Sequence, residues 1–429
     1  MSTFDLFLDL TLVFFLLLVV LNYRAHRSVL YPPFIFCAMW LLDLTIYRLG
    51  LIEINPVHGN TLAIVAAGAA AFSVGGLLAG LTPRTLLRIH LFPLKPGKTP
   101  DSLRNMLMIV LLCGLVAMFY QSRELAGGSF NIAKAGQATV EAIESGENHS
   151  SLMDHFLTIS IGASLLFATE KRDRKFWVVT IIAFTGCILS GGRTGLLLLI
   201  PGQSAIYLLQ TKQESLRSAI RFLRWPIALF VTLFIGMFFI GKDTGEMTGS
   251  VVDIAKGTLI GYIVGPLVAF DSVVQSPAGF VMATSHVFQF PLSLAANLHL
   301  ITNYTKPPQF DSFIFIPFQM NVYTVFKFYF VELGTAVTMV LMAFFGLINS
   351  LFYLKAREGG RFSTYLFAYS MFTVLLIIFD DHYYEIDALL RAIALGLLYF
   401  LIGSVPLRLL PAIKVRRQSK NTRLESSNV

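Results

Sequence analysis

Long apolar runs separated by short polar stretches recur along the whole chain. A helix of about 20 apolar residues, at 1.5 Å rise per residue, crosses the roughly 30 Å hydrocarbon core of a bilayer. The pattern predicts an all-α polytopic membrane protein, with residues 1–429 forming a single integral membrane domain. Eleven membrane-spanning helices are expected, at 4–23, 29–47, 61–81, 106–120, 152–168, 176–190, 195–209, 225–240, 332–353, 363–379 and 389–405.

One late segment departs from this pattern. Between Gly241 and Phe326 the chain leaves the run of spanning helices for roughly 86 residues, a stretch we call the excursion. Within it, 257–270 is apolar but too short to span comfortably, and 279–301 is long enough but contains Pro291 and several polar residues. Broken backbone at membrane depth is tolerated only where protein buries it or water reaches it. The excursion is therefore expected to be re-entrant or interfacial, around a cavity that opens outward, with an ordinary helical pair as the alternative.

Composition supports the membrane assignment and orients the chain. Hydrophobic residues make up 55% of the sequence, charged residues 14%, and the mean hydropathy is +0.69. Basic residues resist translocation across a membrane. With the N-terminus outside, 24 of the 33 basic residues fall on the cytoplasmic side, in loops 24–28, 82–105, 169–175, 210–224, 354–362 and the tail from Arg408. The excursion is then non-cytoplasmic and the C-terminus cytoplasmic, and the net charge of +8 reflects topology and not nucleic-acid binding.

Ionisable residues inside apolar segments are costly and are candidates for function. Asp9 and Asp43 are expected to form structural pairs inside the bundle. Arg193 stands in a turn of small residues, Ser190-Gly191-Gly192-Arg193-Thr194-Gly195, where Thr194 could cap the next helix. A helix N-terminus with an added bidentate guanidinium is suited to a diphosphate. The alternative is an arginine that extends from an interfacial turn into water.

Two further segments could carry chemistry. Asn321-Val322-Tyr323-Thr324 leads into a stretch that places Lys327 and Glu332 among aromatic residues, which suits a sugar or a lipid headgroup but also an interfacial anchor. The last outer loop, 380–387, is rich in carboxylates around His382, and could hold a divalent cation, supply a base or be merely solvated. His286 and His299 lack metal-ligand spacing, and the three cysteines lie in predicted helices. A zinc site is therefore not expected, and no metal ligand or cofactor is assigned.

Three stretches together resemble the Wzy-type O-antigen polymerases, bacterial enzymes that polymerise oligosaccharide repeat units. They are Gly191-Gly192-Arg193-Thr194, Tyr262-Ile263-Val264-Gly265-Pro266 with Phe270-Asp271, and Asn321-Val322-Tyr323-Thr324 with Glu332-Leu333-Gly334. The resemblance covers the whole chain in topology and mainly 190–335 in motif. Lys327 and Glu332 stand where arginine and aspartate are more usual in that family, so the bidentate geometry of an arginine is lost at Lys327.

The resemblance implies a GT-C-like glycosyltransferase of the bacterial inner membrane, acting on undecaprenyl-diphosphate-linked repeat units at the periplasmic face. It implies that the growing glycan moves from its lipid to a newly flipped unit. Partners would be the bilayer, lipid-linked glycans, and a chain-length regulator and a flippase of the same pathway. Arg193 would stabilise the leaving diphosphate, and Glu332, Asp311 and His382 are the candidate bases. The expected substrate-binding residues are Gly191, Gly192, Thr194, Tyr262, Asn321, Tyr323, Lys327 and Arg391.

Two other functions share much of this pattern. An O-antigen ligase uses the same kind of lipid-linked donor but transfers it to the lipid A core. A lipid-linked-oligosaccharide flippase needs access from both faces and usually has pseudo-symmetric halves. The late position of the excursion, with no counterpart in the first half of the chain, argues against such symmetry.

The orientation is tested with reporter fusions placed after Gly249 and after Asn303. Because the basic residues concentrate in the alternate loops, a reporter active only outside the cytoplasm should work at both positions. Cytoplasmic signal at both would reverse the orientation and remove the proposed chemistry from the periplasm.

Overall fold

The computed structural model describes residues 3–81, 99–129, 134, 151–190, 193–241, 251–276, 285–305, 307, 314–316, 319–379, 383 and 386–404. A helix lies at each of the eleven expected positions: α1 (Thr3–His26), α2 (Pro32–Arg48), α3 (Gly59–Leu81), α5 (Asp101–Leu125), α7 (Ser151–Glu170), α8 (Arg174–Leu189), α9 (Arg193–Thr211), α10 (Leu216–Gly241), α13 (Lys327–Arg357), α14 (Arg361–Leu375) and α15 (Ile386–Ser404). Within α1, α3, α5 and α13 lie stretches long and apolar enough to cross a membrane. The structure is predominantly helical and compatible with the expected all-α membrane protein; that all eleven helices span stays a prediction.

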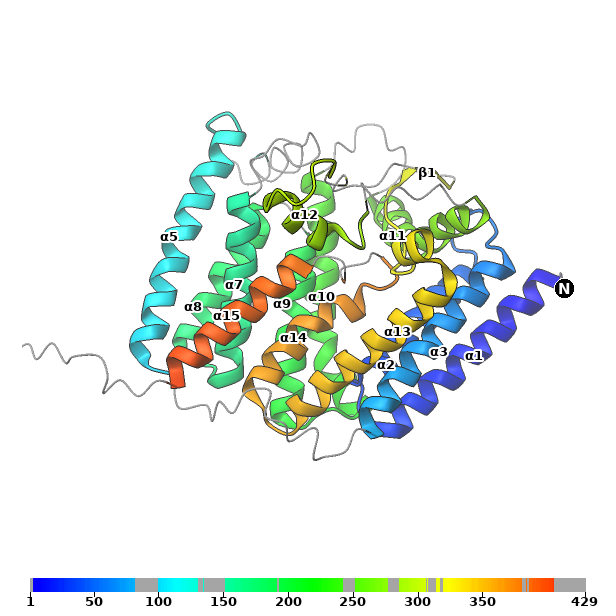
Figure 1. Ribbon diagram of the computed structural model, residues 1–429, viewed down its shortest axis with the longest axis horizontal. Helices are drawn as coiled ribbons and strands as arrows, with labels where there is room; N and C mark the ends of the chain where they lie inside the picture. The colour runs from blue at the N-terminus through cyan, green and yellow to red at the C-terminus, as the bar shows by residue number, and fades with distance from the viewer. Residues whose placement is uncertain are drawn as a thin grey trace, which may run out of the picture.

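The excursion contains two more helices, and they differ from expectation in opposite ways. Helix α11 (Val251–Gln275) has 25 residues, so the apolar run 257–270 is only the middle of a longer helix. The run 279–301 yields only the nine residues of α12 (Gln289–Asn297), none of them buried. A short antiparallel pair, β1 (Ile314–Phe315) and β2 (Gln319–Met320), follows. Figure 1 shows α12 and β1 at one end of the bundle, which we call the excursion end.

The helices form two groups with separate hydrophobic clusters. The first cluster is built mainly from α1, α2, α3, α11 and α13, and the second from α5, α7, α8 and α15. Helices α9 and α14 contribute to both clusters and therefore join the groups. Every residue from Thr364 to Phe372 of α14 is buried, so neighbouring segments enclose this part of the helix on all sides. Helix α14 lies between the groups in Figure 1.

Helices α3 and α13 touch through their backbones. A Cβ atom added to Gly346 would lie 2.1 Å from the carbonyl oxygen of Phe72, and one added to Gly75 would lie 1.8 Å from that of Ala343. Small residues at a helix crossing allow such close approach, and packing of this kind associates helices in a membrane. These glycines therefore set the position of α13 along α3.

Loops expected on the cytoplasmic side meet at the end opposite the excursion. Glu214, between α9 and α10, accepts hydrogen bonds from the Ser28 hydroxyl (2.5 Å) and from the Tyr353 hydroxyl (2.7 Å). Its other oxygen lies 3.6 Å from Nε of Arg357. The contacts join the three loops predicted at 24–28, 210–224 and 354–362. That these loops share one side is confirmed; which face of the membrane they occupy stays a prediction.

A second ionic cluster joins two more loops of the same predicted side. Arg104 donates to both carboxylate oxygens of Asp173, at 2.7 and 2.9 Å, and its Nε lies 3.8 Å from Glu170. The Arg104 hydrogen bond holds the pKa of Asp173 below its usual range. Asp173 also caps α8, since its side chain accepts from the backbone N–H of Phe176. Residues 99–105 therefore lie beside the loop at 169–175, which agrees with the prediction that the two basic loops share one side.

The two aspartates expected to pair inside the bundle behave differently. Asp9 pairs with Arg48 (2.9 Å), which also contacts Asp5 (3.1 Å), at a partly exposed surface. Asp43 is fully buried, and neither of its oxygens has a hydrogen-bond partner among the described residues. The prediction of pairing is right for Asp9, although the pair is not internal, and wrong for Asp43.

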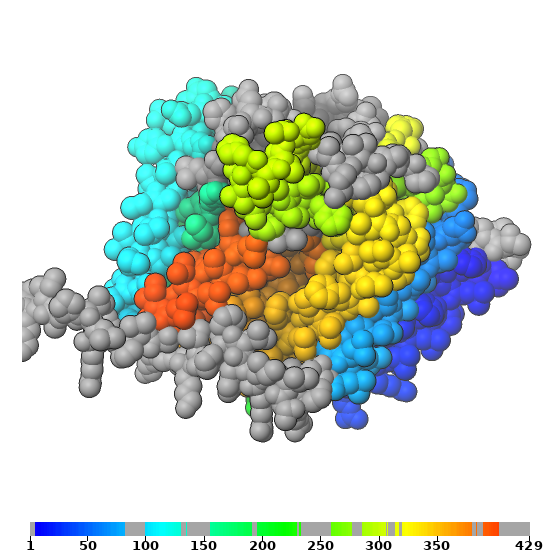
Figure 2. Space-filling view, viewed as in Figure 1, coloured from blue at the N-terminus to red at the C-terminus, as the bar shows by residue number. Residues whose placement is uncertain are grey.

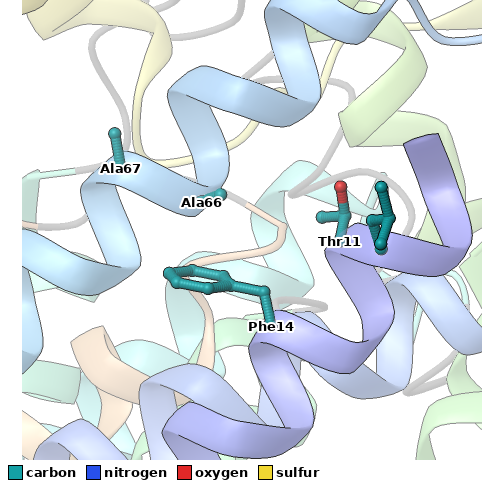
Figure 3. A pocket seen from close by; sticks show the side chains of 5 residues that line it. Thr11, Phe14, Ala66 and Ala67 are labelled. Atoms are coloured by element: carbon teal, nitrogen blue, oxygen red, sulfur yellow. The ribbon is translucent and has the colours of Figure 1, made fainter.

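A shallow hollow lies between α1 and α3 (Figure 3). Its lining residues are Leu10, Thr11, Phe14, Ala66 and Ala67. The one hydroxyl among them, that of Thr11, donates to the carbonyl of Phe7 (2.8 Å). The hollow therefore presents an apolar surface suited to a hydrocarbon chain and offers no group for chemistry.

Replacing Gly346 with alanine should destabilise the fold. The added Cβ would overlap the backbone of Phe72, and overpacking of this kind costs about 1–3 kcal/mol. Gly80→Ala, on the face of α3 where the nearest atom is 3.8 Å away, should be neutral or stabilising by up to about 1 kcal/mol. Thermal unfolding in detergent measures both. Equal unfolding midpoints for the two variants would contradict the proposed backbone contact.

Candidate functional site

The segment Asn321–Phe326 runs deep into the bundle from the excursion end. The Phe326 ring occupies the space where a Cβ on Gly68 would lie (2.2 Å), and it stacks on Trp40 with ring centroids 5.7 Å apart. Gly68 lies nine residues into α3, about 14 Å along the helix at 1.5 Å per residue. Non-helical backbone is thus buried in protein at depth, as a membrane requires. The sequence predicted broken backbone at 257–301; the deep non-helical segment at Asn321–Phe326 lies further along the chain.

A second non-helical segment lies beside the first. The backbone N–H of Val325 donates to the carbonyl of Ile377 (2.9 Å), just after the end of α14, and Ile377 is fully buried. Further on, the Tyr383 ring stacks on Phe345 at 4.1 Å, and its hydroxyl accepts from Asn349 (3.0 Å). Tyr383 belongs to the acidic loop at 380–387. Its two contacts place this residue against α13.

Lys327, the first residue of α13, is held over aromatic rings. Its ammonium nitrogen lies 3.6 Å from the ring centroid of Tyr323 and 4.9 Å from that of Phe328. Tyr323 is only 4% exposed, so its ring forms a fixed floor beneath the cation. A cation over an aromatic face gains about 0.5–2 kcal/mol. Tyr323 therefore positions Lys327, and the partly exposed lysine presents the charge.

Glu332 ties the excursion to α13. Its carboxylate accepts hydrogen bonds from the Ser285 hydroxyl and from the backbone N–H groups of His286 (2.8 Å) and Val287 (3.2 Å). The His286 ring stacks on Phe328 at 4.1 Å. Figure 2 shows residues 285–305 lying across the excursion end beside α13. Because three donors occupy its oxygens, Glu332 is better suited to anchoring this segment than to the expected role of general base.

Gly334 separates the first part of α13 from its long straight part. Its φ of 76° and ψ of 171° are non-helical, in a region that side chains with a Cβ rarely adopt. The residues that carry Lys327 and Glu332 therefore form a short separate helix above the portion that packs on α3. The sequence predicted that these two residues lie at the start of the helix that follows the excursion, and the structure confirms it.

The structure describes the backbone of Arg193, the cationic residue expected at the N-terminus of α9. Helix α9 begins at Arg193, followed by Thr194, as the turn predicted. It runs from there to the Glu214 loop, so Arg193 stands at the excursion end. The side chains of both residues lie outside the described part, as do Gly191, Gly192, Asp311 and His382. Their expected roles stay predictions.

Arg391 lies near the start of α15, whose neighbour α7 supplies His155. A guanidinium nitrogen of Arg391 is 2.6 Å from Nδ1 of His155. Because arginine always donates, Nδ1 must accept, which leaves the imidazole neutral with its proton on Nε2. Arg391 was expected to bind substrate. The contact with His155 fixes the orientation of the Arg391 side chain. Tyr262, also expected to bind substrate, is half-buried in α11.

Sequence reasoning missed one pair entirely. His58, just before α3, has its Nδ1 2.8 Å from a carboxylate oxygen of Asp271 near the end of α11. The residues are 213 positions apart, so no local spacing could pair them. The available signals were weak: His58 precedes an apolar run at its predicted outer end, and Asp271 closes the run 257–270. Among the described residues, no group of three or more His, Cys, Asp or Glu could hold a metal ion.

Comparisons of the chain with protein-family models, with curated proteins and with solved structures found no match.

Replacing Glu332 with glutamine should loosen residues 285–297. The glutamine amide keeps the shape of the side chain. Its N–H₂ group, however, is a donor and would face a hydroxyl or N–H that now donates to the carboxylate, so that hydrogen bond is lost. Losing charge-assisted hydrogen bonds at about 1.5–3 kcal/mol should speed amide exchange at His286 and Val287 on the order of 10- to 100-fold. Hydrogen–deuterium exchange measures this. Glu358→Gln, at an exposed carboxylate paired with Lys355, is the control; equal exchange in both variants would remove the anchoring role.

Proposed function

We propose that this protein is a glycosyltransferase that polymerises undecaprenyl-diphosphate-linked repeat units at the periplasmic face of the bacterial inner membrane. The observation that carries the proposal is that three helices with a cationic residue near their starts, α9, α13 and α15, begin at the same end of the helix bundle. Lys327 is held over Tyr323 at this end, and α9 begins there at Arg193. Arg391 stands near the same end on α15. Anionic lipid-linked substrates fit such an end, because it meets both the lipid and the water phase.

The proposed reaction requires groups that stabilise negative charge on the leaving group. Displacement at the anomeric carbon releases a lipid diphosphate, which needs stabilisation of its charge more than it needs a proton. Arg193 and the free backbone N–H groups at the start of α9 are suited to that task. Lys327 offers a second positive charge, held in place by the buried ring of Tyr323.

The first experiment deletes the gene and separates surface polysaccharide on a gel. A polymerase predicts loss of the ladder of long chains, with single repeat units still attached to the lipid A core. If the single-unit band disappears as well, the ligase or the flippase replaces the polymerase. An unchanged ladder would remove all three.

The second experiment replaces Arg193 in the complemented strain. Removing one preorganised donor from a developing charge costs on the order of 10²–10³ in rate, so Arg193→Ala should abolish long chains at normal protein levels. Arg193→Lys keeps the charge without the bidentate fork and should leave shorter chains. The matched control is Arg123→Ala, since Arg123 lies in the last turn of α5 and binds the carbonyl of Gly128. A normal ladder from Arg193→Ala would identify the residue as an interfacial anchor.

A further inference from the structure

We propose that His58 and Asp271 form the proton-accepting dyad of the transfer reaction, with His58 as the base for the acceptor hydroxyl and Asp271 as its positioning residue. The inference rests on the proposed function, because it assigns a role within that reaction. Its basis is the juxtaposition of a buried carboxylate and an exposed imidazole at the excursion end.

The carboxylate is built into the protein. Only 7% of the Asp271 side chain is exposed. One oxygen accepts from the backbone N–H of His58 (2.9 Å), the residue before α3, and from the hydroxyl of Thr61 (2.6 Å), so this carboxylate oxygen caps the start of α3. The other oxygen lies 2.8 Å from Nδ1 of His58. Capping uses the first oxygen alone, so the second is available to hold the imidazole.

This contact sets the chemistry of the ring. An ionised carboxylate only accepts hydrogen bonds, so Nδ1 of neutral His58 carries the proton and Nε2 carries the lone pair. The side chain of His58 is 60% exposed, which lets a substrate approach the ring. When Nε2 takes up a proton, the buried carboxylate stabilises the resulting imidazolium. The same division of labour operates in hydrolytic triads, where the aspartate orients the histidine and stays ionised.

The dyad belongs to the same wall of the bundle as Lys327. Asp271 follows Phe270, whose ring packs against Phe326 (6.0 Å) and Phe330 (5.8 Å). These two phenylalanines flank Lys327 in sequence, at the start of α13. The imidazole and the ammonium are therefore carried by elements that pack directly on each other.

The acceptor hydroxyl oxygen bonds to the anomeric carbon of the donor while the bond from that carbon to the phosphate oxygen breaks. The bonding pair leaves with the lipid diphosphate. The hydroxyl proton passes to Nε2 of His58, and from the exposed ring it returns to water. No oxidant, metal or further reactant is needed.

The test uses the full-length protein, purified and reconstituted in phosphatidylethanolamine–phosphatidylglycerol vesicles. Its substrate is the pool of lipid-linked repeat units extracted from the deletion strain. A general base contributes about 10²–10⁴ in rate, so His58→Ala should slow polymer formation at least 10²-fold. Added imidazole, which can enter the vacated and exposed position, should restore part of the rate. His299→Ala, at an exposed histidine of the same end, is the control and should retain the wild-type rate.

Asp271→Asn separates positioning from capping. Its amide oxygen can still cap α3, but its N–H₂ group would face Nδ1 and favour the opposite tautomer, which puts the proton on Nε2. We expect a rate loss of about 10²-fold or more with a nearly unchanged KM. Thr61→Val weakens the cap and leaves the dyad, so it should lower the thermal midpoint and keep a rate at least tenfold above that of Asp271→Asn.

The outcomes also distinguish this inference from the proposed function. Wild-type rates in His58→Ala, or a loss that imidazole does not restore in folded protein, would overturn the base role while wild-type polymerisation still supports the function. If the wild-type protein forms no polymer from these lipid-linked units, the proposed function fails, and the dyad's role in it fails with it.

Discussion

The direct backbone contact between α3 and α13 is the constraint on which the site depends. Gly75 and Gly346 let the two helices approach until carbonyl oxygens occupy the space of side chains. In a bilayer, where lipid tails are as apolar as leucine, such packing supplies much of the drive for association. The contact sets α13 against α3, so that Phe326 fills the space over Gly68 and Lys327 begins its helix beside Phe270 and α3. A shift of α13 would displace both the cation and the wall that carries His58.

Buried or half-buried carboxylates then tie together segments that are distant in sequence. Glu332 holds the 285–287 turn, Asp271 holds the start of α3, and Glu214 holds three loops at the opposite end. Each accepts two or more hydrogen bonds, which satisfies its charge away from bulk water. Truncating one would leave its donors unpaired, a loss of about 1–3 kcal/mol for each buried group. The covering segment of the site is thus held by polar bonds, while the bundle below is held by packing.

Hydropathy was a reliable guide where a segment is uniformly apolar. All eleven expected runs coincide with helices, and loops predicted to share a side are joined by Glu214 and by Arg104. It was less reliable in the excursion. The 257–270 run marks only the most apolar part of α11, because helix ends tolerate polar residues such as Lys256. For 279–301 the polar residues did signal a break, yet the deep non-helical backbone lies at Asn321–Phe326, in a stretch that reads as an ordinary approach to the next helix.

The sequence by itself determined the helical membrane class, the helix positions and the alternation of loops, because these follow from local apolar length and from the cost of moving basic residues across a bilayer. It also pointed to Lys327 and Glu332 through their aromatic neighbours. Tertiary structure alone decided which polar groups meet. Glu332 anchors a turn 46 residues earlier, and Asp271 reaches a histidine 213 residues away. Such pairs depend on how helices pack, and that is decided by shape complementarity among many side chains at once, which no local pattern records.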